Sequence, residues 1–283
     1  MTSLIAASSS IPLNAQSFVS NTEYITNSVV LTLLATGVIV YWAWRATRRM
    51  ELVPSAPQNL FEALVEVLYD MFDGIVGHHM AKRVFCLLAS LFVFILIANW
   101  CALLPGVGSI GWGHPAPGIL PFAVDHVDVP LLRPTTADMN MTLAMAAVFM
   151  VLWLWWSLAE MGVGGFLSHI FGVKGGLKGM MALMLAPIFL FVGVIEVISI
   201  MFRPLSLSLR LYGNVFAGEN LLVTMLTLGK QFGFPNWLAY LSSVILPLPF
   251  YFLEILIGLL QAVVFALLCA VYIQLSTTHD EAH

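Results

Sequence analysis

The sequence predicts an all-α integral membrane protein, because of its composition and two kinds of apolar pattern. Of its 283 residues, 60% are hydrophobic and only 9% are charged, whereas soluble domains have about 45–50% apolar and about 25% charged residues. Several apolar stretches reach the roughly 20 residues that a membrane-spanning helix needs, and one further segment is amphipathic. We therefore expect about five membrane-embedded helices and one interfacial helix, within a single domain that covers residues 1–283.

Three separate spans are predicted in the first part of the chain. An outer N-terminal segment, 1–23, precedes the first span, which contains no Asp, Glu, Lys or Arg and ends with Trp42 and Trp44. Tryptophan is enriched at membrane–water interfaces, so these two residues mark the end of the span. The three spans are expected at residues 24–44, 84–104 and 139–159.

The segment 57–77 differs from the spans because it carries acidic residues on one side. Its apolar residues recur at helical spacing, while Glu62, Glu66, Asp70 and Asp73 occupy another face. This pattern is typical of an amphipathic helix that is too polar to cross a membrane. We expect it to lie at the membrane surface or against a partner helix.

The C-terminal part of the chain holds two apolar stretches that are too long for simple spans, 179–231 and 237–275. As a single helix, the first would be roughly 75 Å long at 1.5 Å per residue, more than twice the thickness of the hydrocarbon core. It must therefore be strongly tilted, kinked near Pro204 or broken. Pro247 and Pro249 are expected to bend the second stretch.

Basic residues outside the spans predict the orientation. If the spans alternate, seven of these residues share one side of the membrane, and Arg133 and Lys230 fall on the other. Because cytoplasmic loops are rich in Lys and Arg, we expect the N-terminus outside and the C-terminus in the cytoplasm. The start of the chain lacks the basic region of a secretory signal, and we expect neither a cleaved signal nor a classical organelle-targeting peptide. This favours a multi-pass protein of a bacterial inner membrane, although a chain encoded in an organelle would lack such a peptide too. The seven residues on the cytoplasmic side are Arg45, Arg48, Arg49, Lys82, Arg83, Lys174 and Lys178.

Polar residues in the two long stretches indicate an antiparallel hairpin. Pairing Arg210 with Gln261 places the turn near residue 236, and pairing Glu219 with Glu254 gives the same position. The local sequence there, Gly-Phe-Pro-Asn-Trp, is an independent turn signal. A single hairpin would therefore place the two residues of each pair at the same height along the neighbouring helices.

Arg210 is an expensive residue in a predicted membrane segment, because a guanidinium does not lose its charge. At the centre of a membrane helix it costs about 2.5–3.5 kcal/mol. At about 100° per residue, Glu196, Arg203 and Asn214 lie within about 40° of its helical face, whereas Glu219 points about 180° away.

The residues of the two hairpin pairs could each serve helix packing if taken alone. Aligned in one hairpin, the four together favour an ion path. They are Arg210, Glu219, Glu254 and Gln261.

Asn99, Asp138 and Asn140 fall near the outer ends of the second and third spans. They could line an aqueous opening on that side, or they could cap helix ends. The sequence contains no nucleotide-binding loop, no set of metal ligands and no nucleophile–base pair. We therefore expect no catalytic residue, cofactor or metal in this chain, and no nucleic-acid partner.

Residues 203–219, Arg-Pro-Leu-Ser-Leu-Ser-Leu-Arg-Leu-Tyr-Gly-Asn-Val-Phe-Ala-Gly-Glu, closely resemble the signature of subunit a of F-type ATP synthases. Three further stretches are similar to the same family and occur in its order, at 97–106, 134–143 and 260–265. The resemblance implies a long tilted C-terminal hairpin packed against a rotating ring of c subunits, the c-ring. It also implies the b and b′ peripheral stalk subunits, the rest of the ATP synthase complex and the lipid bilayer as partners.

By this resemblance, Arg210 is the essential arginine that faces the ring carboxylate, with Gln261 near it. Glu219 and Glu254 line the half-channel open to the outer side, where two nearby carboxylates tend to share a proton. The resemblance also implies that Asn214 is a polar position of the proton path. Glu196 would lie toward the cytoplasmic exit of the path.

The function implied by the resemblance is that of a proton-translocating stator subunit, which offers two offset half-channels to the c-ring and couples proton flow to rotation and ATP synthesis. Catalysis would belong to the complex. The alternative from another class is a stand-alone secondary transporter with an intramembrane Arg–Glu site. Inverted repeats would favour that transporter, and the sequence shows none. A purely structural membrane scaffold is a third reading, which the aligned polar residues disfavour.

Overall fold

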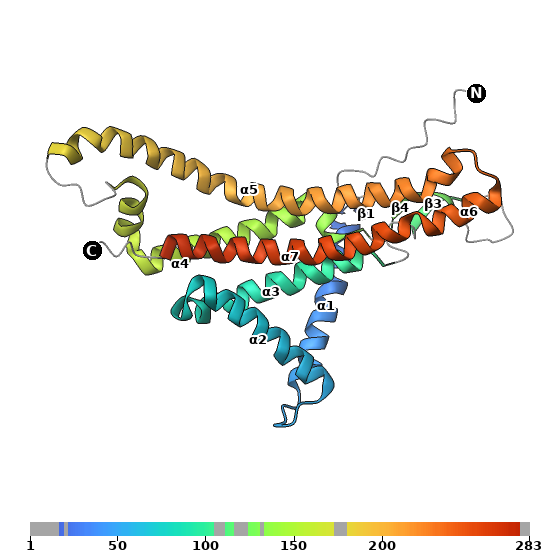
Figure 1. Ribbon diagram of the computed structural model, residues 1–283, viewed down its shortest axis with the longest axis horizontal. Helices are drawn as coiled ribbons and strands as arrows, with labels where there is room; N and C mark the ends of the chain where they lie inside the picture. Colours follow the sequence, from blue (N-terminus) through green and yellow to red (C-terminus); the bar gives the residue numbers. More distant parts are fainter. Residues whose placement is uncertain are drawn as a thin grey trace. The chain divides into compact units, whose positions relative to one another are not determined.

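The computed structural model describes residues 17–19, 22–104, 111–115, 124–130, 133–172 and 180–277 (Figure 1). Most of these residues lie in α-helices, and five helical stretches are long and apolar enough to cross a membrane. The prediction of an all-α membrane protein with about five embedded helices is therefore confirmed.

Three helices correspond to the first three predicted spans. They are α1 (Asn27–Thr47), α3 (His78–Ala102) and α4 (Met139–Phe171). Helix α3 starts six residues before the predicted span and includes the basic residues Lys82 and Arg83 in its first turns. Helix α4 continues well beyond 159, but Gly162 has a φ of 69° and a ψ of 167°. Since this conformation is not helical, α4 consists of a long piece and a short piece.

The predicted amphipathic segment forms α2 (Ala56–Val76). Pro57 occupies its first turn, where proline is favoured because the first N–H groups of a helix have no partner within the helix. Leu68, Phe72 and Val76 are buried on its apolar side. The helix ends at Gly77, whose φ of 82° is a conformation that glycine adopts readily.

The two long C-terminal stretches form three helices, namely α5 (Met180–Gln231), α6 (Asn236–Ile245) and α7 (Pro247–Thr277). Helix α5 continues through Pro187 and Pro204. The second stretch is divided at Leu246, and α7 starts with Pro247, a position where the missing N–H of proline costs no hydrogen bond within the helix. Between α5 and α6, Gly233 has a φ of 69°.

Within the described residues, four short strands lie outside the helices, and the sequence predicted none of them. One strand includes residues 24–26, so the first helix begins three residues later than the predicted span 24–44. Strands β1 (Ser17–Val19) and β2 (Thr22–Thr26) form one antiparallel pair. Strands β3 (Gly111–Pro115) and β4 (Val124–Pro130) form a second. Pairing satisfies backbone N–H and C=O groups that no helix accommodates. One turn of 3₁₀ helix, Thr135–Ala137, leads into α4.

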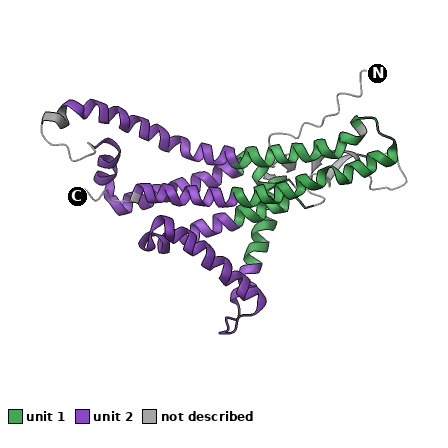
Figure 2. Cartoon of the chain, in the orientation of Figure 1, with its two compact units in different colours: residues 1–41, 94–141, 211–261 green, residues 42–93, 142–210, 262–283 purple. Residues whose placement is uncertain are grey.

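The chain divides into two compact units, shown in different colours in Figure 2. Unit 1 contains residues 1–41, 94–141 and 211–261, and unit 2 contains 42–93, 142–210 and 262–283. The boundary falls inside the long helices, so each unit has its own set of helix segments. The core of unit 1 includes Leu31, Ala35, Ile95, Ala98 and Leu211; that of unit 2 includes Phe72, Val84, Leu88, Phe149 and Trp153.

Hydrogen bonds within unit 2 fix α4 and α7 in a parallel register. The Trp153 indole Nε1 donates to the Tyr272 carbonyl oxygen at 2.8 Å, and the Ser157 and Ser276 hydroxyls are 2.9 Å apart. Both pairs are separated by the same 119 positions. Two equal offsets one helical turn apart require parallel helices.

Candidate proton path

Within unit 1, the last part of α5 runs antiparallel to α6 and the first part of α7. The Asn214 Nδ2 atom donates to Gln261 Oε1 at 2.9 Å. Further along, Gly218 lies against the Glu254 carboxylate, and Gly229 lies against Ser242. Residue numbers rise on one helix as they fall on the other, as the hairpin predicted from the sequence requires.

Gly218 makes room for the Glu254 side chain. A Cβ atom at position 218 would meet the carboxylate of Glu254, so the glutamate side chain holds this place only because position 218 has no side chain. This contact places Glu254 one residue away from the position of Glu219 on α5, close to the predicted level. Small residues in a membrane helix allow a neighbouring helix to approach closely.

Glu219 belongs to unit 1. Its Oε2 atom is buried and, within the described part of the chain, has no hydrogen-bond partner. Arg133, in the same unit, is also buried, and its guanidinium donates to the Ala137 carbonyl oxygen at 3.3 Å. The sequence placed Arg133 on the outer side but indicated no part for it in the path. Its position directly before the family-like stretch at 134–143 was the available signal.

Arg210 is exposed on α5. Within the described residues its guanidinium has no hydrogen bond or ion pair. The surroundings of Arg210 differ from one side of α5 to the other, because Leu207, Ser208 and Leu211 are buried while the arginine is exposed. The guanidinium therefore lies on the side of this part of α5 that the described chain does not cover.

Glu196 has a partner within unit 2. Its Oε1 atom accepts a hydrogen bond from Arg203 at 3.0 Å. The Arg203 guanidinium also lies 5.5 Å from the ring centre of Trp153 and 4.7 Å from that of Tyr272. Of the residues predicted to share the Arg210 face, two are therefore brought together as an ion pair.

The three candidates for an outer opening differ in their surroundings. Asn99 is buried, donates to the Gly258 carbonyl oxygen at 3.2 Å and accepts from Thr136 at 2.9 Å. Asp138 is buried, accepts from Ser28 at 2.8 Å and caps α4 by accepting from the backbone N–H of Asn140 at 3.0 Å. The Asn140 side chain is exposed.

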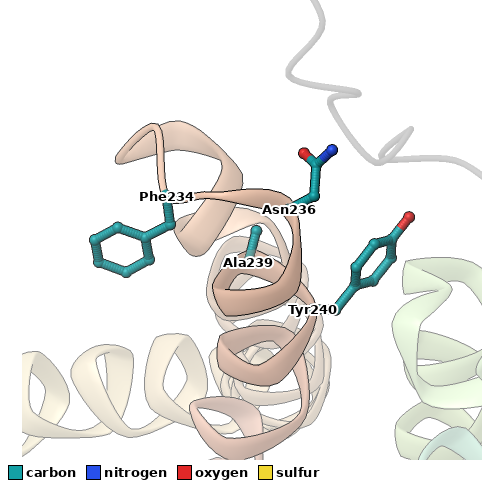
Figure 3. Close-up of a pocket in the computed structure, with 4 residues that line it drawn as sticks. All are labelled: Phe234, Asn236, Ala239 and Tyr240. Carbon is teal, nitrogen blue, oxygen red and sulfur yellow. The ribbon is translucent and has the colours of Figure 1, made fainter.

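In the described part of the chain, no group of three His, Cys, Asp or Glu side chains could hold a metal ion. The hollow shown in Figure 3 lies at the turn between α5 and α6 and is lined by Phe234, Asn236, Ala239 and Tyr240. The rings of Phe234 and Tyr240 point away from each other (Figure 3), so they do not enclose a ligand.

Comparison with known proteins gives a consistent result. A family described as ATP synthase A chain matches residues 29–274, a range that includes segments of both units. The chain is 30% identical to ATP synthase subunit a of Protochlamydia amoebophila, over 88% of this chain and 79% of that one. It is also 30% identical to the subunits a of Moorella thermoacetica and Gloeobacter violaceus, with 87% and 90% of this chain and 85% and 86% of theirs covered. The chain therefore belongs to the ATP synthase A chain family and is a multi-pass membrane protein of the proton-translocating sector of ATP synthase.

Proposed function

We propose that this subunit is the stator that offers two offset half-channels to the carboxylates of a c-ring, and that it thereby couples proton flow to ring rotation and ATP synthesis. The observation that carries the proposal is the exposure of Arg210 on α5, without an ion pair in the described chain. A passing ring carboxylate would supply the missing negative charge.

Arg210 would separate the two half-channels. An opposite charge favours the ionised form of a carboxylate, so a protonated ring carboxylate that arrives beside Arg210 tends to release its proton. The permanent positive charge also repels a proton that would otherwise cross directly. Since each charge that crosses gains about 2.3 kcal/mol per 100 mV, a leak at this point would waste the energy that drives rotation. The hydrogen-bonded pair of Asn214 and Gln261 would line the part of the path that belongs to unit 1.

The outer half-channel would use Glu219 and Glu254 as successive proton carriers. Their side chains belong to the same unit, one residue apart in the hairpin register, which supports a relay. Asn99 and Asp138 are buried and hydrogen-bonded, so we assign them to the wall of the outer path. The exposed Asn140 would meet water at its opening.

The cytoplasmic half-channel would end at Glu196. Its side chain is 41% exposed although its ion-pair partner is only 12% exposed, which supports a carboxylate presented to water. We further propose that the protein lies in a bacterial inner membrane with its N-terminus outside, and that it contacts the c-ring and the b and b′ stalk subunits. A stand-alone transporter would need to compensate Arg210 within its own chain.

Replacement of the arginine tests the proposal. Arg210→Ala should abolish ATP-driven proton pumping and ATP synthesis in inverted membrane vesicles while the complex still assembles. Arg48→Ala is the matched control, because Arg48 is exposed and stacks on Trp44 at 4.8 Å, outside the proposed path. Normal coupled synthesis in the Arg210→Ala complex would overturn the proposed role.

A further inference from the structure

Arg203 is held by aromatic side chains from two other helices. Its guanidinium carbon lies 4.7 Å from the ring centre of Tyr272 on α7 and 5.5 Å from that of Trp153 on α4. Both distances are within the roughly 6 Å range of a cation–π contact. The two rings belong to a fixed platform, since the Trp153 Nε1 donates to the Tyr272 carbonyl oxygen at 2.8 Å. All of these residues lie in unit 2.

The ion pair between Arg203 and Glu196 is asymmetric. The arginine side chain is 12% exposed and the glutamate side chain 41% exposed. Both residues lie on α5, seven positions and therefore about two turns apart. Side chains on a helix lean toward its N-terminus, so Arg203 reaches back to Glu196. The arginine side chain is thus held against the protein, whereas the glutamate side chain lies at the surface.

The contact with the two aromatic rings changes the effect of the ion pair on the glutamate side chain. An exposed salt bridge gains little because two long side chains must be ordered together. Here the rings already order the arginine, so the pair mainly restricts the carboxylate. A guanidinium suits this arrangement because it is planar, stacks on aromatic faces and presents several N–H donors in fixed directions. A lysine ammonium has the charge but not the stacking surface.

We propose that Arg203 is a positioning residue that holds the Glu196 carboxylate at a fixed place in the proton exit, with Trp153 and Tyr272 as its platform. The proposal rests on the role proposed above for Glu196. Arg203 does not meet the proton itself and acts only through that carboxylate. Loss of Arg203 should therefore have no effect once Glu196 has been replaced.

Passive proton flux through the membrane sector tests this coupling. The intact complex is assembled in vesicles, its soluble sector is stripped, and flux is measured under an imposed potential. Arg203→Gln should reduce flux about tenfold, the loss expected of one charge-assisted hydrogen bond. Arg203→Lys should restore only part of it. Arg48→Gln should leave flux unchanged, because its cation–π contact with Trp44 is exposed and lies outside the path.

The platform is tested without touching the ion pair. Tyr272→Leu removes the ring but keeps the carbonyl oxygen that accepts from Trp153, and it should reduce flux about fivefold. Tyr272→Phe keeps the ring and should behave like the native protein. If Arg203→Gln fails to assemble, this pair of variants decides: equal flux in Tyr272→Leu and Tyr272→Phe would overturn the proposal.

The double variants separate the failure of this proposal from failure of the exit itself. With Glu196→Gln in place, adding Arg203→Gln or Tyr272→Leu should reduce flux no further, since both are expected to act through the same carboxylate. If the flux losses of the single variants instead multiplied in the double variants, the positioning role would be overturned. Slow flux in Glu196→Gln with normal flux in Arg203→Gln would also reject it and leave the exit role of Glu196 standing. Normal flux in Glu196→Gln would remove Glu196 from the path and, with it, the basis of this proposal.

Discussion

The charged residues in the embedded helices of this subunit differ in whether they have a partner within the chain. Glu196 is paired with Arg203, and Arg210 has no ion pair within the described chain. The sequence alone identified the acidic residues and Arg210, because ionisable groups in apolar helices are rare and costly. It did not indicate that Arg133 is buried, since Arg133 lies outside the predicted spans.

The two outer carboxylates should be required together. Replacing both, as Glu219→Gln with Glu254→Gln, should lower proton flux about a hundredfold, because general acid–base groups contribute at least that much to proton transfer. ATP-driven quenching of a pH-sensitive dye in inverted vesicles measures the effect. Glu66→Gln on α2, an exposed acidic residue, is the control that should leave pumping unchanged. Unchanged flux in the double variant would remove both residues from the path.

The close contact at Gly218 should make a small substitution harmful. Gly218→Ala puts a methyl group where the Glu254 carboxylate lies, so this flexible side chain has to turn away from α5. We expect slower pumping, with the melting temperature of the purified complex unchanged. Gly37→Ala on α1 is the matched control, because no atom lies within 4 Å of the added Cβ position. Equal effects of the two substitutions would show that the contact does not matter.

At the scale of elements, the sequence predicted what depends on length and local chemistry. Apolar runs fixed the number of embedded helices, proline at 247 predicted the division of the last stretch, and glycine with proline predicted the hairpin turn. The extension of α4 beyond 159 was not predicted, because it depends on the unusual backbone of Gly162. The aromatic platform under Arg203 was also missed. It depends on how α4 and α7 are rotated against each other, which no local pattern records.

The turn between α5 and α6 should depend on glycine. Gly233 has a φ of 69°, a conformation that costs a residue with a Cβ roughly 1–2 kcal/mol. Gly233→Ala should therefore lower the melting temperature of the purified complex. Gly233→Asn should be milder, because asparagine tolerates this conformation better. Equal melting temperatures for native protein, Gly233→Ala and Gly233→Asn would show that the turn adapts at no cost.

At the scale of the whole molecule, charge outside the helices predicts the orientation in the membrane. Single cysteines replace Glu51, in the segment between α1 and α2, and Asn236, at the α5–α6 turn, in a background in which Cys86, Cys101 and Cys269 are replaced by alanine. Both positions are exposed. A membrane-impermeant maleimide should label Glu51→Cys in inverted vesicles and Asn236→Cys in right-side-out vesicles. The reverse pattern would overturn the proposed orientation.

The uncovered arginine also bears on how the complex is built. In the proposed complex, a ring carboxylate offsets the charge of Arg210, which costs about 2.5–3.5 kcal/mol at the centre of a membrane helix. Without a c-ring this exposed cation has no such partner, so we expect the newly made subunit to be least stable before it docks. The lifetime of the subunit in the cell should therefore increase with the number of c-rings available for docking. Copies that do not dock should be degraded first.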